Sequence, residues 1–76
     1  MMRQLLPAKV YFPPKGLRPV RAVSTGGGYF LYDSEMGASI PPRFEVRADG
    51  SVWDWHGGRV DWTVDDLAES DETFDR

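Results

Sequence analysis

Hydrophobic and polar residues alternate most clearly between residues 43 and 62. The alternating runs are residues 43–47 (RFEVR), 52–55 (VWDW) and 59–62 (RVDW). A period of two is typical of a strand that buries one face. Asp49-Gly50 and Gly57-Gly58 separate the runs, and such pairs favour two-residue hairpin turns because both positions accept positive φ. We therefore predict a three-stranded meander over residues 43–62.

Two-residue turns would also fix the register of this meander. They would bring six large apolar side chains to one face: Phe44, Val46, Trp53, Trp55, Val60 and Trp62. A slip of one residue would scatter this set over both faces. The opposite face would then align Glu45, Asp54 and Asp61 across adjacent strands. We interpret these carboxylates as a charged surface screened by neighbouring arginines, because arginines would repel a hard cation such as Ca²⁺ or Mg²⁺.

A short helix is predicted directly after the meander. The segment Thr63-Val64-Asp65-Asp66 resembles a capping box, with Asp66 in the place that Glu usually holds. Trp62 and Leu67 are spaced for a hydrophobic staple across the first turn. We predict one or two helical turns near residues 64–70, followed by a frayed acidic tail over residues 71–76.

The first half of the chain contains further strand candidates between Gly and Pro breaks. These candidates are residues 8–12, 20–24 and 29–32, with a hairpin at Gly26-Gly27-Gly28 and a loop over residues 33–42. Residues 12–19 are predicted to form a stiff, basic connection. The fold class predicted is mostly β, a small antiparallel barrel of five or six strands with an SH3-like or OB-like shape.

Length and composition narrow the class of protein. The chain has 76 residues, 41% of them apolar and none of them Cys. We predict one domain over residues 1–76, because domains rarely fall below about 50 residues. No apolar run approaches the roughly 20 residues that a membrane helix needs. We expect a cytoplasmic protein that does not bind membranes.

Charge is divided unevenly along the chain. Residues 1–32 contain five basic residues and no acidic ones, whereas residues 61–76 contain seven acidic residues and one Arg. One interpretation is that a basic half packs beside an acidic half, with the acidic tail in solvent. The other is a dipolar surface that steers a charged partner.

No catalytic constellation stands out in the sequence. His56 is the single histidine and lies near Asp54, but the serines and threonines are in turns with no reason to meet it. A lone His without Cys is also a poor zinc site. We therefore predict a protein that is not an enzyme, with no catalytic residues, no metal ligands and no cofactor.

The leading functional hypothesis is a small interaction module that docks on a protein partner. An acidic surface around one Trp would make the contact, through Asp61, Trp62, Asp65, Asp66 and Glu69. Small acidic proteins of phages and other mobile elements often inhibit host machinery, and by analogy an inhibitor of this kind is one form of the hypothesis. Self-association is also open, since a small sheet gains stability by covering an edge.

The alternative hypothesis is binding of single-stranded nucleic acid by the basic, aromatic N-terminal half. Cations would contact phosphates while aromatic rings stack on bases. The residues proposed for this surface are Lys9, Tyr11, Lys15, Arg18, Arg21 and Tyr29. The net charge of -3 argues against it, since nucleic-acid-binding proteins more often carry a basic balance.

Overall fold

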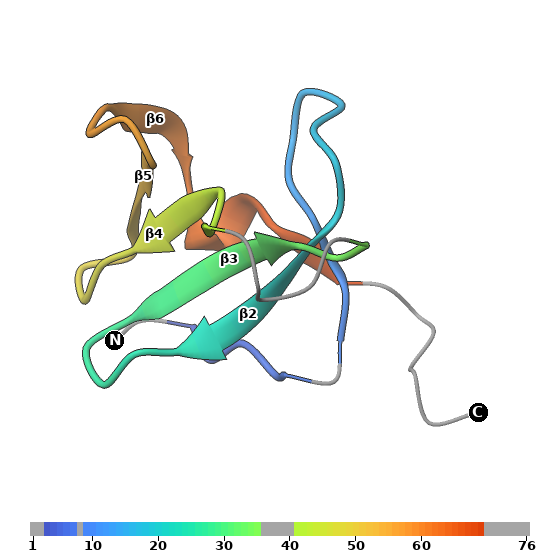
Figure 1. The fold of residues 1–76 in the computed structure, drawn as a ribbon, viewed down its shortest axis with the longest axis horizontal. Coiled ribbons are helices and arrows are strands. Elements are labelled where there is room, and N and C mark those ends of the chain that lie inside the picture. The colour runs from blue at the N-terminus through green and yellow to red at the C-terminus, as the bar shows by residue number, and fades with distance from the viewer. Residues whose placement is uncertain (1–2, 8, 36–40, 70–76) are drawn as a thin grey trace.

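The described residues form one antiparallel sheet with a single short helical turn (Figure 1). The computed structural model describes residues 3–7, 9–35 and 41–69. Its elements are β1 (Tyr11–Phe12), β2 (Val20–Ser24), β3 (Tyr29–Asp33), β4 (Phe44–Val46), β5 (Ser51–Asp54), β6 (Arg59–Thr63), the 3₁₀ turn η1 (Val64–Asp66) and β7 (Ala68–Glu69). The predicted mostly-β class is confirmed. The described residues form seven strands rather than five or six.

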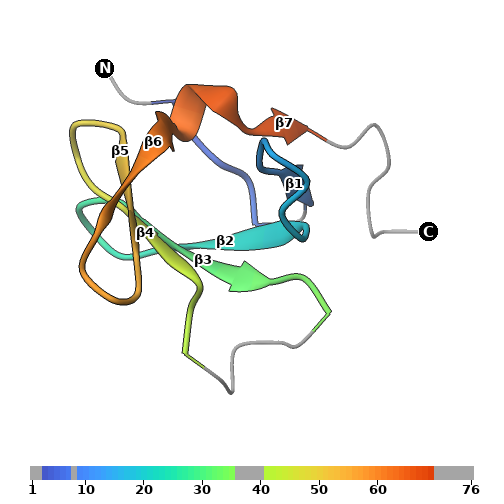
Figure 2. The same cartoon turned by 90° about the horizontal axis from the view of Figure 1, so that it is seen from above.

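The sheet is curled into a half-barrel (Figure 2). Its strand order is β6-β5-β4-β3-β2-β1-β7, so β6 and β7 lie at opposite ends of the order. Along the chain, these two strands are separated only by η1 and Leu67. A flat sheet would hold its two ends far apart, because neighbouring strands are spaced by about 4.8 Å. The sheet therefore curls until the short η1 segment can join its ends.

The two hairpins of the meander have longer loops than the sequence pattern predicts. The Arg47 N–H donates to the Ser51 carbonyl at 2.9 Å, and the Asp54 N–H donates to the Gly58 carbonyl at 2.8 Å. Each pair encloses three residues rather than two. The third residue of each loop is a glycine at positive φ, Gly50 at 87° and Gly57 at 91°. This is the three-residue hairpin in which a type I turn is followed by a left-handed residue.

The longer loops shift the register, so the predicted pairing within the meander is wrong. Val46 pairs with Val52, and Glu45 pairs with Trp53. The expected alignment of Glu45 with Asp54 is also wrong, because Phe44 is the residue opposite Asp54. One extra loop residue thus moves Trp53 away from the core face of the sheet.

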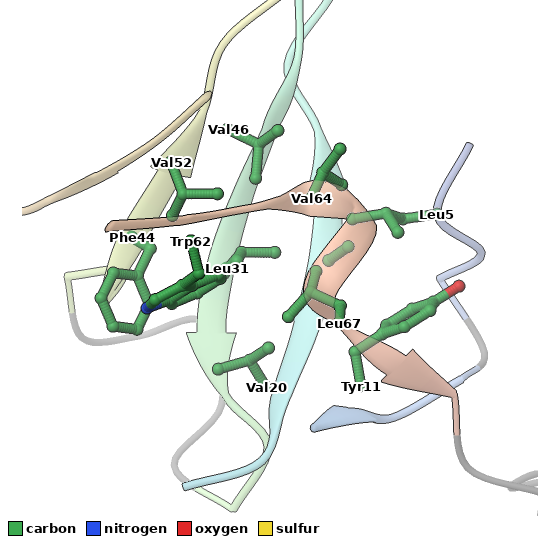
Figure 3. Close-up of a cluster of buried hydrophobic side chains, with 11 residues drawn as sticks. Leu5, Tyr11, Val20, Leu31, Phe44, Val46, Val52, Trp62, Val64 and Leu67 are labelled. Carbon is green, nitrogen blue, oxygen red and sulfur yellow. The ribbon is translucent and has the colours of Figure 1, made fainter. Parts of the chain in front are cut away.

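The core lies inside the curl of the sheet (Figure 3). It contains Leu5, Tyr11, Val20, Ala22, Leu31, Phe44, Val46, Val52, Trp62, Val64 and Leu67. The rings of Phe44 and Trp62 meet edge to face, with their centroids 5.2 Å apart. Aromatic pairs in this geometry add about 0.5–1.5 kcal/mol to the free energy gained by burying their area. Trp62 and Leu67 are both buried, on either side of η1.

The predicted helix near residues 64–70 is shorter than expected. It is the single turn η1, and residues 68–69 form β7 instead. The Thr63 N–H donates to the Asp66 carboxylate at 2.9 Å, which is one half of the predicted capping box. Leu67 then adopts extended backbone and ends the turn. The predicted frayed tail over 71–76 lies outside the described residues.

Hydrogen bonds connect the N-terminal segment, residues 3–6, to η1, to Leu67 and to two tyrosines of the sheet. Arg3 Nη1 donates to the carbonyls of Val64 at 3.0 Å and Leu67 at 2.6 Å. Two tyrosine hydroxyls accept backbone N–H groups of the same segment, Tyr29 from Leu5 and Tyr11 from Leu6. Helical turns leave carbonyls at their ends with few backbone partners. The Val64 carbonyl accepts the Leu67 N–H, and Arg3 supplies a second donor to it and one to the Leu67 carbonyl.

Candidate functional site

The outer face of the sheet carries an aromatic surface that the sequence analysis did not select. The register places Val23, Phe30, Glu45 and Trp53 in one row across β2, β3, β4 and β5. Tyr32 lies beside this row on β3, opposite Arg21. We define the aromatic face as Val23, Phe30, Tyr32, Trp53 and Trp55. Trp55 belongs to it because its ring centroid lies 5.5 Å from that of Phe30.

Rings of the aromatic face contact one another while remaining partly open to solvent, with Phe30, Tyr32 and Trp53 half-buried and Trp55 exposed. Phe30 meets Tyr32 and Trp55 edge to face. Trp55 is 48% exposed and Val23 is 46% exposed. Single exposed apolar residues are ordinary, but a continuous exposed apolar patch marks an interaction surface.

Trp53 is held in one orientation by its neighbours in the first hairpin. Asp49 Oδ1 accepts hydrogen bonds from the N–H and the hydroxyl of Ser51. The Ser51 hydroxyl in turn accepts the Trp53 indole N–H at 3.0 Å. The Arg47 guanidinium lies 4.0 Å from the Trp53 ring centroid, within the range of a cation–π contact. The ring is therefore positioned before any partner arrives.

A surface groove adjoins the aromatic face and shares Trp55 with it. The groove has a volume of about 660 Å³. It is lined by Arg18, Asp33, Pro41, Pro42, Arg43, Phe44, Asp54, Trp55 and His56. Ligand sites usually enclose about 300–1,000 Å³, so the groove is large enough for a few residues of a peptide or for a small molecule.

Asp33 is the buried charge beneath this groove. It is 3% exposed, and its carboxylate accepts the Glu35 N–H at 2.9 Å and the Arg18 Nε–H at 2.8 Å. Arg43 Nη1 lies 3.6 Å from the same carboxylate. The bond from the Glu35 N–H lowers the pKa of Asp33 most, and the two arginines lower it further against the opposing effect of burial. Asp33 is therefore an anion that fixes two cations at the groove.

The Asp54 carboxylate accepts hydrogen bonds from the backbone of the second hairpin. Its Oδ1 atom accepts the backbone N–H groups of Gly58 and His56, both at 2.9 Å. Both bonds lower the pKa of Asp54, and the bond from the Gly58 N–H contributes most. His56 lines the groove, and its bond to this carboxylate comes from the backbone N–H. The geometry is that of a turn held by an aspartate.

The residues predicted for the acidic docking surface do not form one open patch. Trp62 is 5% exposed and belongs to the core. Asp61 pairs with Lys15, and Glu69 pairs with Lys9 and Arg3. Asp66 accepts the Thr63 N–H, whereas Asp65 is exposed on η1. The basic half and the acidic half are thus joined by ion pairs, as the first interpretation of the charge pattern expects.

The residues predicted to bind nucleic acid are also spread over several environments. Tyr11 is fully buried, and the Tyr29 hydroxyl is engaged by the N-terminal segment. Lys9 and Lys15 take part in the ion pairs with the acidic half, and Arg18 pairs with Asp33 and Glu35. Arg21 is exposed on β2, opposite Tyr32 of the aromatic face.

A signal for the aromatic face was present in the sequence. Residues 29–32 (YFLY) place large side chains at both even and odd positions of one strand. Such a strand must direct aromatic rings to both faces of its sheet. The same holds for residues 52–55 (VWDW), where Val52 takes the core position and Trp53 the outer one.

Within residues 3–7, 9–35 and 41–69, no group of three or more His, Cys, Asp or Glu side chains could hold a metal ion. No helix among these residues has the length and apolar character to cross a membrane.

Comparisons with known proteins give no relative from which a role can be transferred. No protein-family model, curated protein or solved structure matches the chain significantly.

Proposed function

We propose that this protein is a non-enzymatic interaction module that docks on a protein partner through the aromatic face. The observation that supports this proposal is the row of apolar side chains across β2, β3 and β5, which lies outside the core: Val23 is exposed, and Phe30 and Trp53 are half-buried. The working surface is therefore the outer face of the sheet rather than the acidic surface around Trp62.

The composition of the aromatic face suits a protein interface. Trp, Tyr and Arg dominate the binding energy of such interfaces, because they combine a large contact area with a polar group. The face supplies Trp53, Trp55 and Tyr32, with Arg47 stacked on Trp53. A ring that is already positioned loses little further conformational entropy when a partner binds.

Charge favours protein over nucleic acid as the partner. Within the described residues, Arg47 lies 3.8 Å from the Glu45 carboxylate. The whole chain carries a net charge of -3. A sheet face of mixed charge on an acidic protein gains little from phosphate contacts, which supply most of the affinity for nucleic acid.

The proposal extends to the finer expectations from the sequence. An SH3-like or OB-like shape and a cytoplasmic location are both compatible with a small docking module. An inhibitor of host machinery, encoded by a phage or another mobile element, would use the aromatic face to cover a functional surface of the host protein.

A capture experiment with matched variants tests the proposal. Phe30→Ser removes a ring from the centre of the aromatic face. Phe12→Ser removes an exposed Phe, 42% accessible, from β1 outside the face. Both variants are first checked for the wild-type circular dichroism spectrum. We expect a partner that the wild type and Phe12→Ser retain from a source lysate, and that Phe30→Ser retains about tenfold less, as befits an interface hot spot. Equal retention by all three proteins would contradict the proposal.

Single-stranded nucleic acid is a second candidate for the same face. The observation that favours it is the set of rings flanked by Arg21 and Arg47 on one sheet surface. Bases stack on such rings, while arginines contact the phosphates. Titration with a labelled single strand and a duplex across a salt series tests this candidate. Binding that weakens steeply with salt and is lost in Arg21→Glu supports it. No binding at low salt excludes it.

A further inference from the structure

The groove beside the aromatic face combines an apolar wall with a fixed pair of arginines. Trp55 and Phe44 contribute rings, and Pro41 and Pro42 contribute rigid apolar surface. Arg18 and Arg43 lie on the same lining. Sites of this kind, mostly apolar with a few positioned polar groups, orient a ligand through those polar groups.

Arg43 is the arginine with hydrogen-bonding capacity to offer. Arg18 donates to Asp33 and to Glu35. Arg43 Nη1 lies 3.6 Å from Asp33, too far for a hydrogen bond, and its side chain is 43% exposed. Among the described residues, no other acidic side chain pairs with Arg43. Its guanidinium is therefore held in place by charge, while its donors remain open to a ligand.

The carboxylates of the groove are already engaged by the protein itself. Asp33 accepts two hydrogen bonds, from Arg18 and from the Glu35 N–H. Asp54 accepts two backbone N–H groups of its own hairpin. An anionic ligand thus meets Arg43 as a donor, next to Asp33, whose two oxygens are both bonded, and Asp54, whose Oδ1 atom accepts both of its bonds.

We propose that the groove binds an acidic segment of the partner protein, in which a carboxylate pairs with Arg43 and a neighbouring apolar side chain packs on Trp55. This inference rests on the proposed docking function and names the chemistry of the partner. The guanidinium offers two parallel donors that match the two oxygens of a carboxylate. Trp55 is shared by the groove and the aromatic face, so one bound segment would continue onto that face.

A peptide is favoured over a nucleic-acid strand at this groove. A strand bound through its phosphates needs a series of cations along its path. Here one arginine has open donors, and the second is bonded to two carboxylates. A single carboxylate next to an apolar side chain satisfies what the groove offers.

Two matched peptides test this inference by NMR titration of the isotope-labelled protein. The probes are acetyl-GDLDG-amide and its neutral counterpart, acetyl-GNLNG-amide. The signals to follow are the Arg43 Nε–H and the Trp55 indole N–H. We expect both signals to shift with the acidic peptide, and the neutral peptide to bind about tenfold more weakly, as the loss of a charged hydrogen bond predicts.

Variants assign the preference to the proposed residues. Arg43→Gln should remove the difference between the two peptides, whereas Trp55→Ser should weaken both. Arg59→Gln, which removes an exposed arginine outside the groove, should preserve the preference. Equal binding of the two peptides to the wild type would overturn the inference, as would a preference that survives Arg43→Gln.

The outcomes separate this inference from the proposed function. Loss of partner capture in Phe30→Ser, together with equal binding of both peptides, would leave the docking function standing and overturn the acidic segment. A preference for the acidic peptide, together with no partner captured through the aromatic face, would support the acidic ligand of the groove and contradict the docking function. A single-stranded oligonucleotide that displaces the acidic peptide in a salt-sensitive way would overturn the assignment to a peptide and assign the groove to phosphates.

Discussion

Gly28 lies directly before β3, beside the backbone of β4 at Val46. A Cβ atom at this position would be 1.9 Å from the carbonyl oxygen of Val46. The obstructing atom belongs to the backbone, so no side-chain rotation can relieve the clash. The glycine thus allows β3 and β4 to approach, and with them the row that contains Phe30 and Trp53.

Replacing Gly28 with Ala should destabilise the protein. We expect the free energy of unfolding to fall by about 1–3 kcal/mol, because the two strands must move apart. Urea unfolding measures this change. Gly27→Ala is the control, since a Cβ at that position has no neighbour within 4 Å. A Gly28→Ala protein as stable as Gly27→Ala would show that the strands separate without cost.

At the scale of elements, Asp33 connects the ends of three strands. It closes β3, while Arg18 precedes β2 and Arg43 precedes β4. Burial of an anion is tolerated here because hydrogen bonds and two cations compensate for the lost hydration. The same cluster positions the arginines of the groove.

The lowered pKa of Asp33 makes stability depend on pH. The bond from the Glu35 N–H is the main cause, and it favours the anion in the folded state. A carboxylate whose folded-state pKa lies below its unfolded value stabilises the fold above the unfolded pKa. That contribution is lost as the pH falls through the folded-state pKa.

Melting temperatures between about pH 7 and pH 2 test this dependence. Asp33→Asn should melt lower than the wild type at neutral pH, and the two curves should converge in acid. Asp65→Asn removes the same charge from an exposed position and should keep the wild-type profile. A constant gap between Asp33→Asn and the wild type at every pH would show that the carboxylate acts through its shape alone.

The sequence predicts the strands better than it predicts their register. The alternation in residues 43–47 and the glycines at 50 and 57 locate both hairpins of the meander. Two-residue and three-residue loops both place glycine at positive φ, so the glycines alone do not distinguish them. In residues 52–55, apolar side chains occupy both faces of the strand. The hydrophobic pattern therefore tolerates either register, and the aromatic face depends on which one forms.

β7 and Arg3 show a different limit of sequence analysis. The two residues of β7, Ala68 and Glu69, have no alternation and pair with β1 only because the sheet curls. Arg3 acts through the carbonyls of Val64 and Leu67, which lie more than 60 positions away. Contacts of this kind are decided by the assembled fold rather than by a local pattern.

At the scale of the whole molecule, Arg3 joins the two ends of the described chain. Its guanidinium donates to Val64 and Leu67, pairs with Glu69 and lies 5.4 Å from the Tyr11 ring centroid. Ion pairs from Lys9 to Glu69 and from Lys15 to Asp61 lie between the same two halves of the sequence. Exposed ion pairs of this type are individually weak, so Arg3 is the main polar link.

Removing this link should weaken the fold without changing its form. We expect Arg3→Ala to lower the free energy of unfolding by about 1–3 kcal/mol, since two carbonyls lose a charged donor. Arg3→Lys should fall between Arg3→Ala and the wild type, because an ammonium lacks the planar fork of a guanidinium. Urea unfolding gives the three values. An Arg3→Ala protein of wild-type stability would show that water replaces the guanidinium at no cost.

The pairing of β1 with β7 also bears on the order in which the molecule assembles. From β2 to β6, each strand pairs with the next one along the chain, so every step closes a short loop. The bridge between Tyr11 and Glu69 instead closes a loop over residues 12–68, and the entropic cost of closure rises with loop length. We expect the hairpins to form first and this seam last. The pairing of β1 with β7 is then also the first to open. Proteolysis and aggregation would begin there, where opening exposes Tyr11 and Leu67, while the aromatic face is still intact.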